Sequence, residues 1–194
     1  MEMKLMEPQI EILPLLTLNL EEILPIVTGY ESTEKYGIEK TESDEQTEFN
    51  IRLVPLEQPH SSSFSEDFNA EDYQRFLGFL PMGFSFGAYH RGRLVAFAIS
   101  ESILWNNSLR IWEFQVMQEY HRQGIGRALM TQVVEKAIHD KFRIVYLETQ
   151  NTNVKAIRFY RALGFSLDAI DLSFYTNHDV ENGEVAFFMK KELE

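Results

Sequence analysis

Two glycines one residue apart, Gly124 and Gly126, stand where a strand-like segment of the chain gives way to a helix-like one. Glycine costs conformational entropy on folding, so a close pair at this place needs a reason. One interpretation is a flexible turn that leads into a helix. The other is a bare backbone whose N–H groups surround a phosphate at the helix N-terminus. Arg122 and Arg127 flank the pair with positive charge.

Neither of two well-known phosphate-binding patterns is completed by this pair. The dinucleotide fingerprint needs a third glycine where Leu129 stands, and a P-loop needs Gly-Lys-Ser/Thr at its end. Apolar residues recur at helical spacing after the glycines, at Leu129, Val133 and Ala137, which predicts a helix packed on a sheet. The glycines would therefore lie at the edge of that sheet.

The remaining apolar and turn-forming residues predict mixed helices and strands. In the first part of the chain we expect a strand, a helix with Asn19 as its N-cap, a polar loop or exposed helix, an irregular segment and a further helix. In order, these are Gln9–Leu18, Leu20–Thr28, Glu31–Asn50, Arg52–Asp67 and Ala70–Leu80.

In the second part the pattern is sharper. Two strands flank a hairpin turn of sequence HRGR, and a further strand precedes the glycines. A helix, a strand, a helix ended by Gly164 and two last strands follow. The segments are Gly83–Tyr89, Leu94–Glu101, Leu109–Met117, Arg127–Asp140, Arg143–Glu148, Asn153–Leu163, Phe165–Tyr175 and Glu184–Lys190.

Composition narrows the function classes. The net charge of −12 argues against nucleic acid, because phosphate backbones are bound by basic surfaces. Residues 110–165 nevertheless carry nine Lys and Arg against five Asp and Glu, a balance of +4 that leaves −16 for the rest. A basic patch suits a small polyphosphate ligand, and an acidic remainder suits a cationic substrate. Solvated surface charge explains the same split.

Other features of the sequence argue against further classes of function. The chain has no cysteine and its five histidines are scattered, so we expect no disulfide, no thiolate nucleophile and no metal. Without an apolar run of membrane-spanning length, we expect a cytoplasmic protein. The segment from Gly83 to Gly87 matches the G-x-S-x-G pattern of hydrolases, but a strand and not a helix is expected after Ser85.

A second motif follows the predicted sheet helix. The stretch NTNVKAIRFYRALGF places Asn153, Ala156 and Tyr160 at helical spacing, with Phe165 just after the glycine stop. Together with the glycine turn, this motif resembles the two core motifs of the GNAT superfamily of acyl-CoA N-acyltransferases. A narrower likeness is to streptothricin acetyltransferases, carried by LETQNTNVKAIRFYRALGF, by LWN upstream and by DLSFYTN downstream.

The resemblance implies an α/β GNAT fold. Its central sheet would be mixed and mostly antiparallel, splayed between the fourth and fifth strands, with helices on both faces. We expect residues 1–194 to form one such domain. Within it, residues 83–190 would be the acetyl-CoA-binding core and residues 1–80 a variable region on the acceptor side.

The resemblance also implies roles for individual residues. The pantetheine arm of acetyl-CoA would bind backbone at Val116 and Met117, with the backbone N–H near Met117 as the oxyanion donor. The pyrophosphate would lie on the turn formed by Arg122, Gln123, Gly124, Ile125, Gly126 and Arg127. His121 departs from the family pattern, which usually has Arg or Gln there. Asn153 would approach the cofactor arm, and Tyr160 would protonate the leaving thiolate.

A base must accept a proton from the amine, and Glu113 in the strand RIWEFQVM is the candidate. Its neighbours Trp112 and Phe114 would desolvate it and raise its pKa, although an outward, solvated side chain is an equally simple interpretation. Tyr160 has a simple alternative too, as a core aromatic on the apolar stripe of its helix.

The implied function is acetyl transfer from acetyl-CoA to a primary amine of a cationic small molecule, such as a streptothricin-type antibiotic. That acceptor would make the protein an antibiotic-resistance enzyme. One alternative is acetylation of a protein lysine or N-terminus, since the same motifs serve both. Another is a degenerate module that binds CoA without catalysis. The sequence leaves the oligomeric state open, a homodimer included.

Overall fold

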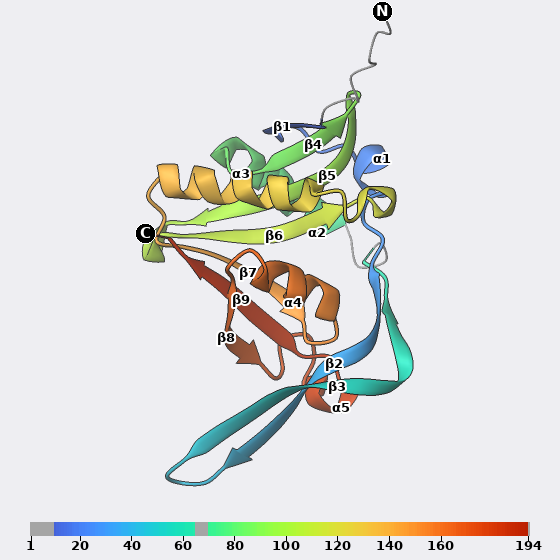
Figure 1. The fold of residues 1–194 in the computed structure, drawn as a ribbon. Helices are drawn as coiled ribbons and strands as arrows, with labels where there is room; N and C mark the ends of the chain where they lie inside the picture. Colours follow the sequence, from blue (N-terminus) through green and yellow to red (C-terminus); the bar gives the residue numbers. More distant parts are fainter. Residues whose placement is uncertain (1–9, 65–69, 194) are drawn as a thin grey trace, which may run out of the picture. The chain divides into compact units, whose positions relative to one another are not determined.

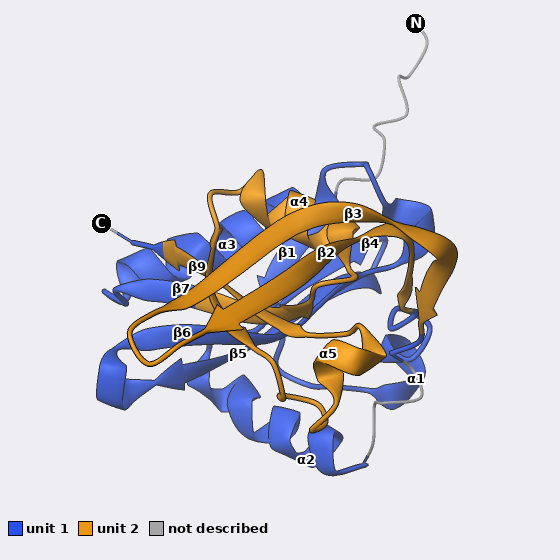
Figure 2. Cartoon of the chain, turned by 90° about the horizontal axis from the view of Figure 1, so that it is seen from below, with its two compact units in different colours: residues 1–28, 63–145, 192–194 blue, residues 29–62, 146–191 orange. Residues whose placement is uncertain are grey.

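The structure, a computed structural model, describes residues 10–64 and 70–193. The chain divides into two compact units, coloured separately in Figure 2. Unit 1 comprises residues 1–28, 63–145 and 192–194, and unit 2 comprises residues 29–62 and 146–191. Both units contain a sheet and helices, so each is described by itself below.

Unit 1 is built on four antiparallel strands in the order β1-β4-β5-β6. Its elements are β1 (Ile10–Pro14), α1 (Leu20–Ile23), α2 (Ala70–Phe79), η1 (Leu80–Met82), β4 (Phe86–His90), β5 (Arg93–Ile103), η2 (Leu104–Asn106), β6 (Ser108–Val116), η3 (Gln118–Tyr120) and α3 (Ile125–His139).

Helices cover both faces of this sheet (Figures 1 and 2). On one face, α3 packs its buried Leu129, Val133 and Ala137 toward the strands, as their helical spacing predicts. On the other face, α1 and α2 join β5 in an apolar cluster. That cluster includes Ile23, Ile26, Phe76, Phe79, Phe97, Ile99 and Met117.

Unit 2 holds the strands β7, β9 and β8 in that order. Its elements are β2 (Tyr30–Glu42), β3 (Thr47–Ser62), most of β7 (Ile144–Gln150), α4 (Val154–Arg161), β8 (Ser166–Asp171), α5 (Asp179–Asn182) and most of β9 (Ala186–Glu192). The predicted fold class, a mixed α/β protein with a mostly antiparallel sheet and helices, is confirmed. The splay between the fourth and fifth strands stays a prediction.

Most local predictions agree with the observed elements. Asn19 caps α1 by accepting a hydrogen bond from the Glu21 N–H (3.0 Å). Arg91 and Gly92 both have positive φ, as the tight turn between β4 and β5 requires. Gly164 ends α4 with φ of 86°. The first strand is shorter than expected and ends at Pro14, and its expected first residue, Gln9, lies outside the described residues.

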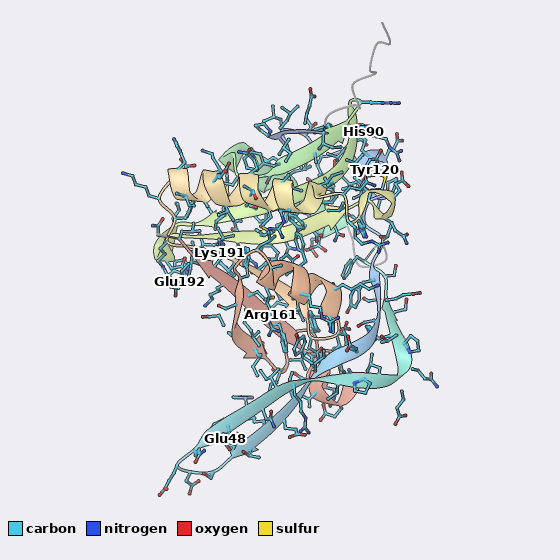
Figure 3. All side chains as sticks on the ribbon, in the orientation of Figure 1. Glu48, His90, Tyr120, Arg161, Lys191 and Glu192 are labelled. Carbon is cyan, nitrogen blue, oxygen red and sulfur yellow. The ribbon has the colours of Figure 1, made fainter. Side chains whose placement is uncertain are left out.

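One prediction is wrong. The segments 31–50 and 52–67 were expected to be a loop or exposed helix and an irregular stretch. Instead, β2 and β3 form one long antiparallel hairpin, closed by a turn at residues 43–46 (Figure 1). Figure 3 places Glu48 toward the free end of this hairpin. Residues 65–67 of the second segment lie outside the described residues.

Asn151, at the end of β7, ties the hairpin to the sheet of unit 2. Its side chain donates to the Tyr36 carbonyl (2.9 Å) and accepts from the Val185 N–H (2.8 Å). Its backbone repeats both links, since Tyr36 N–H donates to Asn151 O and Asn151 N–H donates to Val185 O. Asn151 is 2% exposed, so water cannot replace these bonds.

We therefore predict that Asn151→Ala destabilises the protein. The substitution leaves the buried Val185 N–H and the buried Tyr36 carbonyl without their side-chain partner. The free energy of unfolding should fall by about 1–3 kcal/mol for each group. Urea unfolding measures the loss, and Asn50→Ala on exposed β3 is the matched control. Equal stability of the two variants would contradict this account of Asn151.

Candidate functional site

Glu113 lies on β6 next to an irregularity in the strand. The pairing of β5 with β6 runs from Ile99–Glu113 to Ser100–Ile111, so Trp112 is the extra residue of a β-bulge. Glu113 is half-buried, and its Oε2 accepts a hydrogen bond from the Gln115 side chain (3.1 Å). Its cross-strand neighbour Ile99 belongs to the apolar cluster, so the carboxylate lies beside apolar surface.

Trp112 is held from several sides. Its indole N–H donates to Glu101 (2.8 Å), its ring stacks on Phe79 (6.0 Å between centroids), and the Arg110 guanidinium lies 3.5 Å from the ring centroid. Arg75 lies 4.3 Å from the same centroid. These contacts fix the bulge next to Glu113, as a positioned base would need.

The end of β6 corrects one prediction. The Met117 N–H donates to the Val95 carbonyl (2.9 Å), so this amide is already used and does not serve as an oxyanion donor. The Val116 carbonyl accepts a hydrogen bond from His121 Nε2 (2.7 Å). His121, the departure from the family pattern, thus links the following turn back to the strand.

In the turn from Arg122 to Arg127, residues 122–124 and 127 are exposed, while Ile125 is buried. Arg122 and Gly124 have positive φ (60° and 84°), and Gly124 is the N-cap of α3 without a side-chain capping bond. The first α-helical hydrogen bond of α3 runs from Ala128 N–H to Gly124 O (3.0 Å). The preceding N–H groups of the first turn therefore have no acceptor within the helix.

This geometry fits a polyphosphate. Free N–H groups and the positive end of the helix dipole attract anions at a helix N-terminus. Arg122, Gln123 and Arg127 are exposed beside them, and the Gln123 side chain is fixed on Glu119 O (2.7 Å). A capping side chain, which would compete for the same amides, is absent at Gly124.

Two contacts hold η3, the segment before this turn, against the hairpin turn of β4 and β5. His90 Nδ1 lies 2.8 Å from the Tyr120 hydroxyl, with the rings edge to face, and Figure 3 labels both residues. Arg93 lies 3.8 Å from Glu119. The turn thus starts from a braced segment.

Asn153 and Tyr160 lie in unit 2, on α4. Asn153 is 8% exposed and caps the helix, accepting from the Ala156 N–H (3.2 Å). Tyr160 is also 8% exposed, and its ring contacts Phe159 and Phe165 (5.4 and 6.0 Å between centroids). Both have structural roles, which leaves a role toward the cofactor as a prediction.

Ser85 of the G-x-S-x-G pattern is no nucleophile. It is 1% exposed, its Oγ accepts from the Ser100 N–H (3.1 Å), and β4 follows it directly. Among the described residues, no helix is long and apolar enough to cross a membrane.

The fold and the glycine turn define an acyl-CoA transferase class, and comparison with known families agrees. The Acetyltransferase (GNAT) family matches residues 53–165. The chain belongs to this family, and the resemblance drawn from its motifs is confirmed.

Its relatives include enzymes named for one antibiotic class. Streptothricin acetyltransferase of Streptomyces lavendulae is 30% identical over 73% of this chain and 75% of that protein. Streptothricin acetyltransferase A of Bacillus subtilis (strain 168) is 34% identical over 43% of this chain, and the match spans 48% of that protein's length. The [ribosomal protein bS18]-alanine N-acetyltransferase of Escherichia coli (strain K12) is 28% identical over 62% and 76%.

Solved structures share the fold of this chain. The crystal structure of nourseothricin acetyltransferase covers 97% of this chain and 99% of its own, with 25% identity and a TM-score of 0.67. A Bacillus anthracis (strain Ames) protein in complex with acetyl coenzyme A covers 95% and 100%, with 21% identity and a TM-score of 0.67. The second likeness is one of fold alone.

We predict that acetyl-CoA raises the thermal midpoint of the protein and that Gly126→Val removes this effect. A valine at the second residue of α3 places a branched side chain next to the free amides. The control is Gly78→Val at an exposed position of α2, where a Cβ meets nothing within 4 Å. If Gly126→Val responds to acetyl-CoA as the wild type does, the turn is not the phosphate site.

Proposed function

We propose that this protein transfers an acetyl group from acetyl-CoA to a primary amine of a cationic small molecule, with a streptothricin-type antibiotic as the leading acceptor. The observation that carries the proposal is the uncapped, arginine-flanked first turn of α3 in a chain of the GNAT family. The relatives named for streptothricin support the acceptor class.

For the donor, the amides of Gly124 to Arg127 would hold the pyrophosphate, and Arg122 would add charge. The carbonyls of Val116 and Met117, each of which can accept a second hydrogen bond, would bind the pantetheine arm, with Asn153 approaching it. Acetyl-CoA supplies the acetyl group as an activated thioester. The protein's part is to orient the amine and to move protons.

For proton transfer, Glu113 would accept the proton that the ammonium must lose before its nitrogen can attack. Its half-buried position beside Ile99 and its support from Trp112 favour this role. Tyr160 would donate a proton to the leaving sulfur. With the Met117 amide engaged in the sheet, the oxyanion donor has to be another group.

For the acceptor, the charge distribution favours a cation. Residues 110–165 carry +4, while the rest of the chain carries −16 within the total of −12. Such a field raises the local concentration of a polycationic amine. We propose that residues 1–194 act as one domain and that residues 1–80, whose β2–β3 hairpin replaces an expected loop, shape the acceptor side.

A second candidate is acetylation of a protein N-terminus or lysine, as a ribosomal-protein alanine N-acetyltransferase is among the relatives. The assay that separates the two measures free thiol release from acetyl-CoA with nourseothricin, simple diamines and short peptides as acceptors. Preference for the antibiotic supports the proposal, and preference for peptides supports the second candidate. No turnover with any amine would indicate a CoA-binding module without catalysis.

We predict that Tyr160→Phe lowers turnover by about 10²–10⁴-fold while the protein stays folded, because it removes one hydroxyl and keeps the ring. Tyr73→Phe, which removes a hydroxyl bonded to Leu18 O in unit 1, is the control. Unchanged turnover in Tyr160→Phe would assign Tyr160 to the core and make water the proton source.

We predict that Glu113→Gln keeps acetyl-CoA binding, lowers the rate and removes the acidic limb of the pH–rate profile. That limb reports deprotonation of the base in the free enzyme. The profiles of wild type and variant are measured on the best amine found. A variant that retains both rate and limb would show that another group, or bulk water, takes the proton.

A further inference from the structure

A group of polar and aromatic side chains in unit 2 lies outside the residues discussed so far. It is centred on Glu184, just before β9, and includes Tyr30 of β2, His60 of β3 and Thr152 in the turn before α4. Tyr175 and Glu148 adjoin it, with the Tyr175 hydroxyl donating to the Glu148 carboxylate. We call these six residues the Glu184 cluster.

Three contacts of the Glu184 side chain are long. Its Oε1 lies 3.3 Å from the Tyr30 hydroxyl, 3.4 Å from Thr152 Oγ1 and 3.5 Å from His60 Nε2. Hydroxyl donors normally approach a carboxylate to 2.5–2.7 Å. The Tyr30 and Thr152 hydroxyls instead lie 2.5 Å from each other. Glu184 is thus surrounded by donors without being closely held by any of these three.

The cluster is half open to solvent. The side chains of Glu184 and His60 are 34% and 30% exposed, and Tyr175 is 39% exposed. Thr152, whose hydroxyl contacts that of Tyr30, is buried (2% exposed). His60 Nε2 is itself buried and makes no hydrogen bond in the structure. A ligand can therefore reach the carboxylate, and a polar atom beside it is left for a partner.

Two carboxylates act on both phenols of the cluster. Burial raises the pKa of Tyr30, and the charges of Glu184 and Glu148 raise it further. Loss of hydration also raises the pKa of Tyr175, with Glu148 and Glu184 acting in the same direction. Both phenols therefore stay neutral at physiological pH.

The loop that carries Tyr175 is held in place by Asp179 of α5. Asp179 accepts hydrogen bonds from Tyr175 N–H (2.8 Å) and from the N–H and hydroxyl of Thr176 (both 2.7 Å). Asp179 is 1% exposed. Burial alone would raise its pKa, but these bonds lower it, so the carboxylate stays ionised and the loop stays formed.

The chemistry that suits this cluster is an alkylammonium group. A loosely held carboxylate gains most from a charged N–H donor, which forms short, charge-assisted hydrogen bonds. The Tyr30 and His60 rings, 5.8 Å apart between centroids, offer apolar and π surface to the adjoining methylenes. A second carboxylate, Glu148, suits a second ammonium.

Resting on the proposed function, we propose that the Glu184 cluster is a specificity subsite that binds an ammonium group of the acceptor, with Glu184 as its main anchor and Glu148 as the second. It selects polycationic amines over neutral or anionic ones. It is a binding site and takes no part in proton transfer.

The kinetic test compares Glu184→Gln and Glu148→Gln with Glu45→Gln, which removes the same charge from the exposed hairpin turn. We expect KM for nourseothricin to rise about 10–100-fold in Glu184→Gln, the loss typical of a hydrogen bond to a charged group, and less in Glu148→Gln. KM for acetyl-CoA should change less than twofold. An unchanged amine KM in Glu184→Gln, or an equal rise in Glu45→Gln, overturns the subsite.

Calorimetric binding separates this proposal from the proposed function. Nourseothricin, 1,5-diaminopentane and the neutral 1,5-pentanediol are titrated into the full chain, with and without CoA. The subsite predicts binding of the two cations and not of the diol, with at least tenfold weaker binding in Glu184→Gln. Cation binding without turnover contradicts the acetyltransferase proposal and retains the subsite. Turnover with cation binding that Glu184→Gln leaves unchanged contradicts the subsite and retains the acetyltransferase.

Discussion

The backbone N–H groups in the first turn of α3 have no acceptor carbonyl within the helix. Contacts around the turn hold it in this conformation. Gly124 takes a left-handed conformation and offers no capping side chain. His121 ties the turn to the end of β6, and the His90–Tyr120 contact braces the segment before it. Buried Leu129 and Val133 anchor the rest of α3 on the sheet. We propose that an anion binds here, since it would satisfy both the amides and the helix dipole.

Much of unit 1 was readable from the sequence because its elements have one apolar and one polar side. The apolar residues of α3 recur at helical spacing, and the HRGR turn contains a glycine at a hairpin position, so both could be recognised from the sequence. The β2–β3 hairpin was missed for a physical reason. Most of its residues are exposed or half-buried, so β2 lacks the apolar alternation that marks a strand. Pro55 and Pro59 further obscured β3, although proline is tolerated at the edge of a two-stranded sheet.

The site was predictable to the extent that it is local. The sequence placed the glycine turn before α3 and Glu113 in β6, as observed, while their functional roles stay predictions. The hydrogen bond from the Met117 N–H to the Val95 carbonyl could not be predicted, because it depends on strand register. The bulge at Trp112 decides which β6 groups pair with β5. The Glu184 cluster gave no sequence signal either, since Tyr30, His60, Thr152 and Glu184 lie far apart in the chain and meet through the hairpin and Asn151.

The most direct test of the central claim is a titration of the ¹⁵N-labelled protein with acetyl-CoA, followed through backbone amide chemical shifts. If the first turn of α3 binds the pyrophosphate, the largest shifts occur at Ile125, Gly126 and Arg127, and inorganic pyrophosphate alone moves the same amides in the same direction at higher concentration. Saturable acetyl-CoA binding that leaves these three amides unshifted would contradict the account.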